Sequence, residues 1–142
     1  MTTDPITLPK AEFAFPGPIR DQLVAAILDG SKTSTTGLLA DYEHCGDPLP
    51  EVGSLAAVVD SNDHRVAVIE VTDVRVTRLA EVDLPHAIDE GEGFTTLTDW
   101  RAVHETYWHS PEMRQSLNNE SFTVNDDTPV ILQRFRLITD LR

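Results

Sequence analysis

The segment from Gly30 to Gly37 constrains the fold most strongly, because it must end one element and begin the next. Before it, apolar residues recur at i, i+4, i+7 and i+8, which predicts an amphipathic helix from about Pro18 to Leu28. Gly30 suits the C-terminal cap of that helix, and the β-branched residues from Thr33 to Thr36 favour a short strand. The segment is therefore expected to join a helix to a strand.

The same segment places Lys32 beside five hydroxyl side chains. The other lysine, Lys10, lies in a polar stretch with two prolines, so residues 1–12 are expected to form a flexible leader. The remaining residues, 13–142, have the length of a single domain. An ammonium group close to hydroxyls is suited to bind an anion or to activate a hydroxyl nucleophile. Lys32 is therefore the first candidate for a functional side chain.

The chain carries 24 acidic against 11 basic residues, a formal net charge of −13. Duplex binding depends on Lys and Arg that neutralise phosphates, so this balance argues against a duplex nucleic-acid partner. It leaves room for a nucleoside in a pocket, or for single-stranded RNA if the arginines gather on one face. A lone Cys45, the lack of a signal-peptide pattern and the lack of a long apolar run predict a cytoplasmic protein without a membrane partner.

The rest of the chain alternates between strand and helix patterns. Strands are expected at 54–60, 65–70, 71–78 and 129–138, and helices at 38–44, after Asp83 and from Thr98 to about His109. Trp100, Val103 and Tyr107 are spaced as a core stripe on the last helix. These patterns predict an α+β fold whose strands form a small mixed or antiparallel β-barrel with flanking helices.

Two carboxylates, Glu90 and Glu92, stand in a glycine-flanked loop. In an extended segment both would point the same way, which raises one pKa and creates an acid or base; a solvated acidic loop is the alternative. None of the five histidines stands in a paired metal-binding spacing, so neither a metal nor a cofactor is expected. Tyr107 and Trp108 are either core residues or a platform on which a base stacks.

The run Gly30-Ser31-Lys32-Thr33-x-Thr35 resembles the GxKT signature of the ASCH domain family. Other segments resemble the longer bacterial members in the same order, so that the likeness covers about residues 13–138. These segments are Leu38–Glu43, Pro48–Gly53, Val68–Thr72, Glu90–Gly93, Trp100-Arg101-x-x-His104 and Pro129–Phe135.

The resemblance implies one PUA-like domain over residues 13–142, a small β-barrel with flanking helices and a cleft beside the GxKT segment. Members are associated with RNA, and a ribonuclease activity is ascribed to a longer member. Compact members remove the acetyl group of N4-acetylcytidine with a Lys, a Thr three residues later and a Glu. By motif these catalytic residues are Lys32, Thr35 and Glu92, with Glu90 as the alternative carboxylate. The candidates for substrate contacts are Thr33, Ser34, Glu90, Tyr107, Trp108 and Ser110.

In the implied reaction Thr35 attacks the amide carbonyl, Lys32 takes its proton or stabilises the oxyanion, and Glu92 holds the lysine or the amine. Residues i and i+3 of a regular strand face opposite sides, so Ser34 is the better-placed hydroxyl unless the segment is kinked. Compact members also carry an arginine soon after the threonine, where this chain has Gly37.

Three hypotheses follow. The first is a hydrolase acting on a modified nucleoside amide such as N4-acetylcytidine. The second is an RNA-binding module or ribonuclease, which requires a basic face shared with Lys32. The third is a non-catalytic module that binds a small ligand, with Lys32 gripping an anion. The oligomeric state is left open. The arginines that the second hypothesis places on that face are Arg75, Arg78, Arg134 and Arg136.

Overall fold

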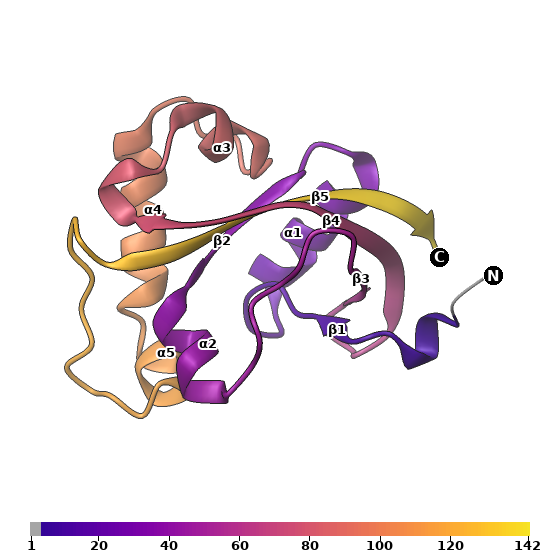
Figure 1. The fold of residues 1–142 in the computed structure, drawn as a ribbon, viewed down its shortest axis with the longest axis horizontal. Coiled ribbons are helices and arrows are strands. Elements are labelled where there is room, and N and C mark those ends of the chain that lie inside the picture. The colour runs from indigo at the N-terminus through magenta and orange to yellow at the C-terminus, as the bar shows by residue number, and fades with distance from the viewer. Residues whose placement is uncertain (1–3) are drawn as a thin grey trace.

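The computed structural model describes residues 4–142 and shows a mixed α+β fold built on one five-stranded sheet (Figure 1). The strands are β1 (Lys10–Ala11), β2 (Ser34–Leu38), β3 (Leu55–Val59), β4 (Arg65–Arg78) and β5 (Pro129–Asp140). The helices are α1 (Pro18–Asp29), α2 (Leu39–Cys45), α3 (Leu84–Asp89), α4 (Leu97–Trp108) and α5 (Pro111–Ser116), with 3-10 turns η1 (Pro5–Thr7) and η2 (Leu79–Glu81). None of the described helices has the length and hydrophobicity needed to cross a membrane.

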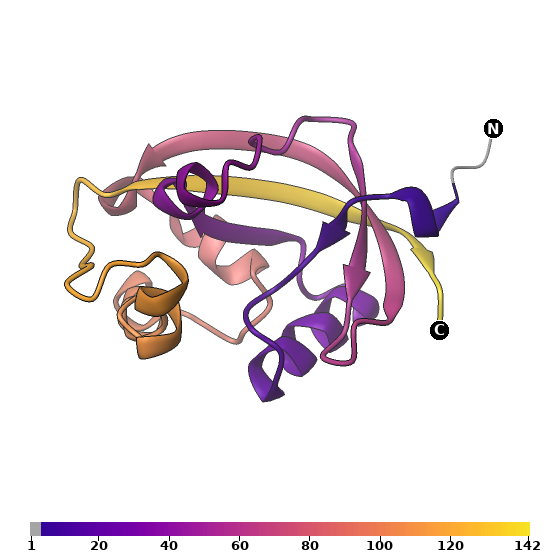
Figure 2. The same cartoon turned by 90° about the horizontal axis from the view of Figure 1, so that it is seen from below.

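The antiparallel strands β4 and β5 form the longest pairing of the sheet and run side by side along the molecule (Figures 1 and 2). The two strands expected at 65–70 and 71–78 form one continuous strand of 14 residues. Its register against β5 shifts between Val68 and Ile69 and again between Val71 and Asp73. Such irregularities bend and twist a strand, so one long strand takes the place of two short ones.

The sheet is open, which corrects the expected β-barrel. Its order is β1-β3-β4-β5-β2, with β1 and β2 at opposite edges. Closure would require β1 and β2 to pair, but β1 has only two residues. The residues just before and at the start of β2 instead contact α3, where the Thr33 amide donates to the carbonyl of Asp89 and the Ser34 hydroxyl to that of His86. Backbone that would otherwise be an exposed edge is thus covered by a helix.

The expected leader contributes an edge strand. Over the residues described, it contains η1 and β1, and β1 pairs in parallel with β3 through Lys10↔Ala57 and Ala11↔Val58. Lys10 also forms an ion pair with Asp63 at 2.7 Å. This pairing is made by backbone groups, which every residue other than proline carries in full, so no pattern of apolar residues in the sequence predicts it.

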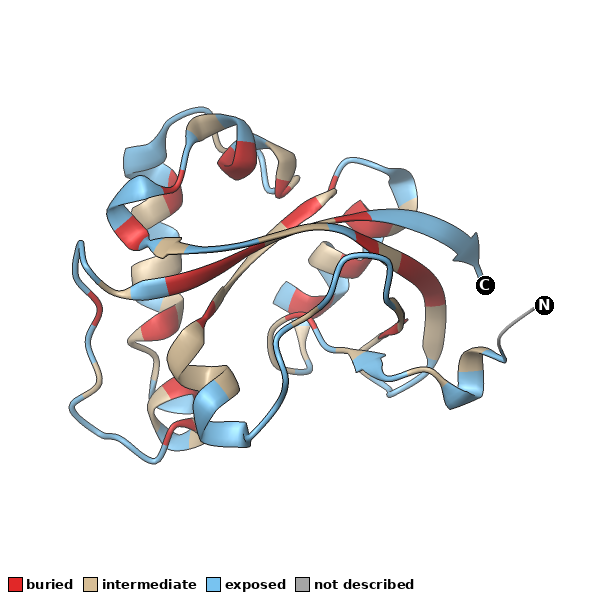
Figure 3. Ribbon diagram, in the orientation of Figure 1, coloured by how far each residue is buried: buried red, intermediate tan, exposed pale blue. Residues whose placement is uncertain are grey.

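Two apolar clusters flank the candidate functional site. The α1-side cluster joins Phe13, Val24 and Ile27 to strand residues such as Ile69 and Phe135. The α4-side cluster joins Trp100 and Trp108 to η2, α3, α5 and the start of β5. Figure 3 shows the buried residues in the first halves of β4 and β5 and on the inward sides of the helices. Segments between the two clusters are therefore enclosed from both sides.

The helix boundaries agree with the sequence in part. Helix α1 ends at the left-handed Gly30 and α3 begins after the cap Asp83, both as predicted. Helix α4 begins two residues earlier than predicted, because the hydroxyl of Thr96 rather than Thr98 accepts from the Asp99 amide. Helix α5, capped by Ser110, was not predicted as a helix.

Candidate functional site

Lys32 lies inside the protein, at the junction of α1 and β2. Its amide donates to the carbonyl of Ala26, and its side chain turns inward so that the residue is 2% exposed. Its Nζ donates to the carbonyl oxygens of Ser34 at 2.7 Å and Glu90 at 3.3 Å. Burial lowers the pKa of this amine, opposed by the negative charges of Glu90 and Glu92. The lysine is therefore a buried polar group rather than a surface cation.

Gly91 allows the loop after α3 to pass directly against the Lys32 segment. A Cβ at this position would lie 2.8 Å from the Lys32 amide nitrogen and from the carbonyl group of Ser31. The φ angle of Gly91 is also 75°, in the left-handed region that favours glycine. This close approach places Glu90 and Glu92, on either side of Gly91, beside the lysine.

Glu90 is the centre of a buried hydrogen-bond network and is 2% exposed. Its Oε2 accepts from the indole Nε1 of Trp100 at 2.6 Å and from the Thr36 hydroxyl at 3.1 Å, and its Oε1 lies 3.2 Å from His104 Nε2. Burial alone would raise the pKa of Glu90, but the hydrogen bonds from His104 and Trp100 and the charges of His104 and Lys32 outweigh it and lower the pKa. Glu90 is therefore an ionised, fully engaged carboxylate.

His104 faces this carboxylate from α4. Its Nδ1 lies 2.8 Å from the carbonyl oxygen of Trp100, which can only accept, so Nδ1 carries a hydrogen. Its ring also stacks on Trp100, with centroids 4.2 Å apart. Burial opposes protonation, yet the contacts with Glu90 and Glu92 raise the pKa of His104. Nε2 is thus directed at two carboxylates.

His86 lies on the other side of the network and is completely buried. Its Nε2 is 2.9 Å from the Thr36 hydroxyl, while its Nδ1 has no hydrogen-bond partner among the described residues. Burial lowers the pKa of His86. A neutral ring that donates from Nε2 to Thr36 lets the Thr36 hydroxyl donate onward to Glu90.

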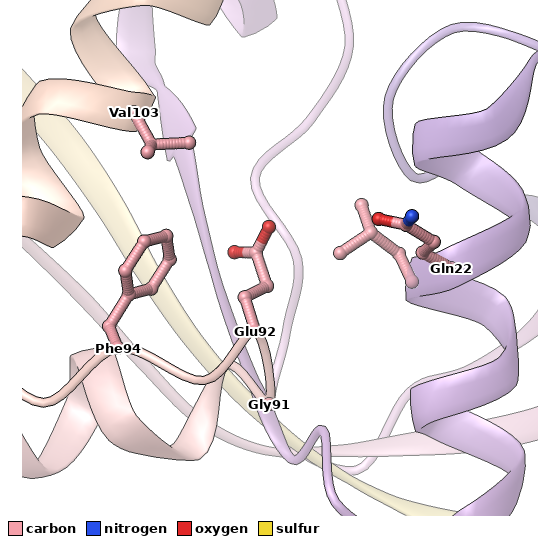
Figure 4. Close-up of a pocket in the computed structure, with 6 residues that line it drawn as sticks. Gln22, Gly91, Glu92, Phe94 and Val103 are labelled. Atoms are coloured by element: carbon pink, nitrogen blue, oxygen red, sulfur yellow. The ribbon is translucent and has the colours of Figure 1, made fainter.

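Glu92 is the carboxylate that reaches an open space. It lines a pocket of about 390 Å³. The other lining residues are Gln22 and Leu23 of α1, Val103 of α4, and Gly91 and Phe94 of the loop between α3 and α4. Figure 4 shows its carboxylate pointing between the side chains of α1 on one side and Phe94 and Val103 on the other. Burial raises the pKa of Glu92, opposite to the direction for Glu90 two residues earlier. Val103, predicted to be a core residue, is 50% exposed at this pocket.

The hydroxyl groups of β2 alternate between the two faces of the strand. Ser34 donates to the His86 carbonyl at 2.8 Å and Thr36 to Glu90, so both face α3 and α4. Thr35 lies between them, paired with Gln133 in an unbroken register, and therefore faces the other side. Lys32 thus contacts the backbone of Ser34 and not the hydroxyl of Thr35. Thr33 is half-buried before the strand, and its amide donates to Asp89.

The three remaining candidates are not among the residues that line the pocket. Trp108 is 2% exposed within the α4-side cluster, and Tyr107 packs on Phe15 with ring centroids 5.8 Å apart. The hydroxyl of Ser110 accepts from the Met113 amide at the start of α5. The structure therefore brings together Lys32, Glu90 and Glu92, and leaves Tyr107, Trp108 and Ser110 in packing and capping positions.

Several site residues were not predicted from the sequence. Trp100 and His104 are four residues apart on α4, a spacing that places them on one face of a helix and could have linked them. Nothing local marks Gln22 on α1 or Thr36 on β2, since their roles depend on which loop the fold brings against them. The additional residues are Gln22, Thr36, His86, Phe94, Trp100 and His104.

The arginines considered for RNA binding are each engaged by carboxylates. Their partners are Asp73 and Asp83 for Arg75, Glu81 and Asp127 for Arg78, Asp89 for Arg134, and Glu70 for Arg136. Lys32 is buried at the α1–β2 junction and adds no positive charge to the surface around these arginines.

Together these features describe a mixed α+β domain with a buried lysine at a helix–strand junction beside a carboxylate-lined pocket. The profile of the ASCH domain family matches residues 12–139, and the chain belongs to this family. The resemblance recognised in the sequence is thereby confirmed, and the expected mixed α+β architecture is observed apart from the closed barrel. No curated protein matches the chain.

Solved structures similar to this chain include other ASCH domains. A protein of Enterococcus faecalis V583 aligns over 94% of this chain and 77% of its own, with 22% identity and a TM-score of 0.77. An ASCH domain of Lactobacillus crispatus JV V101 aligns over 91% and 79%, with 23% identity and a TM-score of 0.74. The ASCH protein of Zymomonas mobilis aligns over 94% and 71%, with 9% identity and a TM-score of 0.52. At these identities the likeness supports the fold alone.

Proposed function

We propose that this ASCH-domain protein is a hydrolase that acts on a modified nucleoside amide such as N4-acetylcytidine. The observation that carries the proposal is the buried amine of Lys32 held beside two glutamates, one of which opens into a pocket. Buried titratable groups of opposite type at a pocket are the usual means of proton transfer and of stabilising a charged intermediate.

The two glutamates have different roles in this proposal. Glu90 already accepts from Trp100 and Thr36 and faces His104, so it serves to hold the site together. Glu92 lines the pocket and is free to accept a hydrogen from the substrate amine. Lys32 supplies positive charge that stabilises the oxyanion. Gly91 packs against the backbone of Lys32 and so keeps the glutamates close to the lysine. Glu92 is therefore the working carboxylate of the proposed reaction.

The identity of the nucleophile is the part of the proposed reaction that variants must test. The Ser34 hydroxyl is committed to the His86 carbonyl, which leaves Thr35 as the candidate from the family motif. Thr35 faces away from the Glu90 network, so its attack requires the substrate carbonyl to approach from the opposite face of β2. A water molecule activated by Glu92 is the alternative nucleophile.

The pocket suits a small neutral ligand. Its volume of about 390 Å³ lies within the range of ordinary ligand sites, and it combines the apolar Phe94 and Val103 with the amide of Gln22. A neutral nucleoside is not repelled by a chain with a net charge of −13. The paired arginines and the buried lysine do not favour the RNA-binding or ribonuclease alternative.

The test is turnover of N4-acetylcytidine, followed by chromatographic appearance of cytidine. We expect Lys32→Met and Glu92→Gln to lower the wild-type rate by about 10²-fold or more, as for loss of an electrostatic or proton-transfer group. Glu112→Gln, an exposed residue of α5, is the matched control and should retain the rate. Thr35→Ala loses the rate if Thr35 is the nucleophile and keeps it if water is.

Thermal unfolding of each variant separates lost chemistry from lost folding. Folded wild-type protein that does not release cytidine would contradict this substrate. Binding of the nucleoside without turnover, abolished by Glu92→Gln, would instead support the non-catalytic ligand-binding module.

A further inference from the structure

Glu90, Glu92 and His104 converge on one point although they come from a loop and a helix. Each offers one atom that lies within 4.8 Å of the other two, an arrangement found at this one place in the described part of the chain. His104 Nε2 is 3.2 Å from Glu90 Oε1 and 4.0 Å from Glu92 Oε2. Two ligand atoms that each lie about 2.1 Å from an ion are at most about 4.2 Å apart, so both distances suit one shared cation.

The surroundings orient these atoms as metal ligands are oriented. The Trp100 carbonyl holds one hydrogen of His104 on Nδ1, which directs Nε2 at the carboxylates. A bound cation takes the place of the Nε2 hydrogen that the ring otherwise shares with Glu90. Trp100 Nε1 and Thr36 occupy Oε2 of Glu90, which leaves Oε1 towards His104. Hydrogen bonds of this kind, from groups outside the ligand set, fix tautomer and direction at metal sites.

An ion can also reach this point. Glu92 lines the pocket, and the side chains of His104 and Glu92 are 12% and 24% exposed. The pocket has room for water in the remaining coordination positions. Two carboxylates and one imidazole match the donors of Zn²⁺ sites that keep an open position, and they also accept Mn²⁺.

We propose that Glu90, Glu92 and His104 bind one divalent transition-metal cation of the Zn²⁺ or Mn²⁺ type at the inner end of this pocket. The histidine spacings predicted no metal, because the three residues meet only through the packing of α4 against the loop after α3. The site stands independently of the proposed hydrolase, since cation binding is measured without substrate.

The test is calorimetric titration of untagged, metal-stripped protein with ZnCl₂ and, separately, MnCl₂. We expect one ion per chain, and affinity at least 10-fold weaker in Glu92→Gln and in His104→Gln. His44→Gln and Glu112→Gln, at exposed positions, are the matched controls and should bind as wild type does. With Co²⁺ as a probe, the visible absorption of an imidazole-ligated ion should appear in wild type and be lost in His104→Gln.

Absence of one-to-one binding of either ion would overturn the proposal, as would equal affinity in wild type and Glu92→Gln. Thermal unfolding checks that the variants are folded, and if His104→Gln does not fold, Glu92→Gln alone decides. A protein that binds Zn²⁺ but leaves N4-acetylcytidine intact refutes the proposed substrate and not the metal site. Turnover without metal binding does the reverse.

Discussion

Acidic and basic side chains meet in two regions of this protein, in contrasting surroundings. Beside the pocket, Lys32 and Glu90 are each 2% exposed, and their polar contacts are made inside the protein. On the outer surface of β4 and β5, the pair of Arg136 and Glu70 has a contact of 2.6 Å, shorter than the 3.2 Å between His104 and Glu90, but the Arg136 side chain is 65% exposed. A short contact between an acidic and a basic side chain therefore occurs here without burial.

Burial, more than contact distance, therefore determines how a charged group behaves in this protein. Water screens the surface pairs, which makes each of them weak. Inside, a charge that loses its partner cannot be solvated, so the partners are mutually required. Burial acts on both glutamates, but it raises the pKa of Glu92 while the pKa of Glu90 is lowered. The two differ because only Glu90 receives enough hydrogen bonds to offset its desolvation.

The largest expected effect is loss of the buried carboxylate. Glu90→Ala should reduce the free energy of unfolding by about 3–5 kcal/mol, because Trp100 Nε1, Thr36 and His104 would all lose their acceptor. Urea unfolding followed by tryptophan fluorescence measures it, with the exposed Glu112→Ala as control. A loss below about 1 kcal/mol would erase the distinction between the two regions.

A smaller loss is expected where the loop meets the lysine. Gly91→Ala combines a left-handed φ of 75° with contacts of 2.8 Å to backbone atoms, whereas Gly93→Ala has a φ of 86° and open space around its Cβ. Gly93→Ala should cost about 1–2 kcal/mol from conformation alone, and Gly91→Ala about 1–3 kcal/mol more from the clash. Equal losses in the two variants, measured by urea unfolding, would show that the close approach to Lys32 is unimportant.

The effect of burial on titration can be followed at Tyr107 of α4, which packs on Phe15. Burial raises the pKa of Tyr107 to about 12, with the charge of Asp41 adding to it. The native state therefore keeps a proton that the unfolded chain loses, so stability declines as pH rises between about 10 and 12. Tyr107→Phe should make this decline shallower in unfolding measured against pH. An unchanged slope would exclude Tyr107 as its source.

The smallest effect is expected on the outer surface. A double-mutant cycle of Arg136→Ala and Glu70→Ala should give a coupling energy below about 1 kcal/mol that decreases with added salt. The same urea titrations in low and high salt provide the measurement. A coupling as large as the loss in Glu90→Ala would overturn the comparison.

Much of the fold was predictable because it depends on local patterns. The α1 helix, the Gly30 cap and the Asp83 cap all appear where the sequence indicates them. The predicted apolar face is confirmed only in part, because Ile19 is 54% exposed whereas Ala26 and Ile27 are buried. Continuity of β4 and the pairing of β1 were not predictable, because bulges and backbone pairing leave no apolar period. The choice of Thr96 over Thr98 shows the same limit at a single turn, since both residues can cap a helix.

The candidate residues Lys32, Glu90 and Glu92 could be identified without a fold, because a rare lysine and a glycine-flanked acidic pair are visible in the sequence. The burial of Glu90 beneath Trp100 and His104, and the opening of Glu92 into the pocket, became apparent only in the folded protein. Solvent access and hydrogen-bond partners depend on packing between distant segments, which no local pattern encodes. Strand alternation did place Ser34 and Thr35 on opposite faces in advance, because that geometry is local.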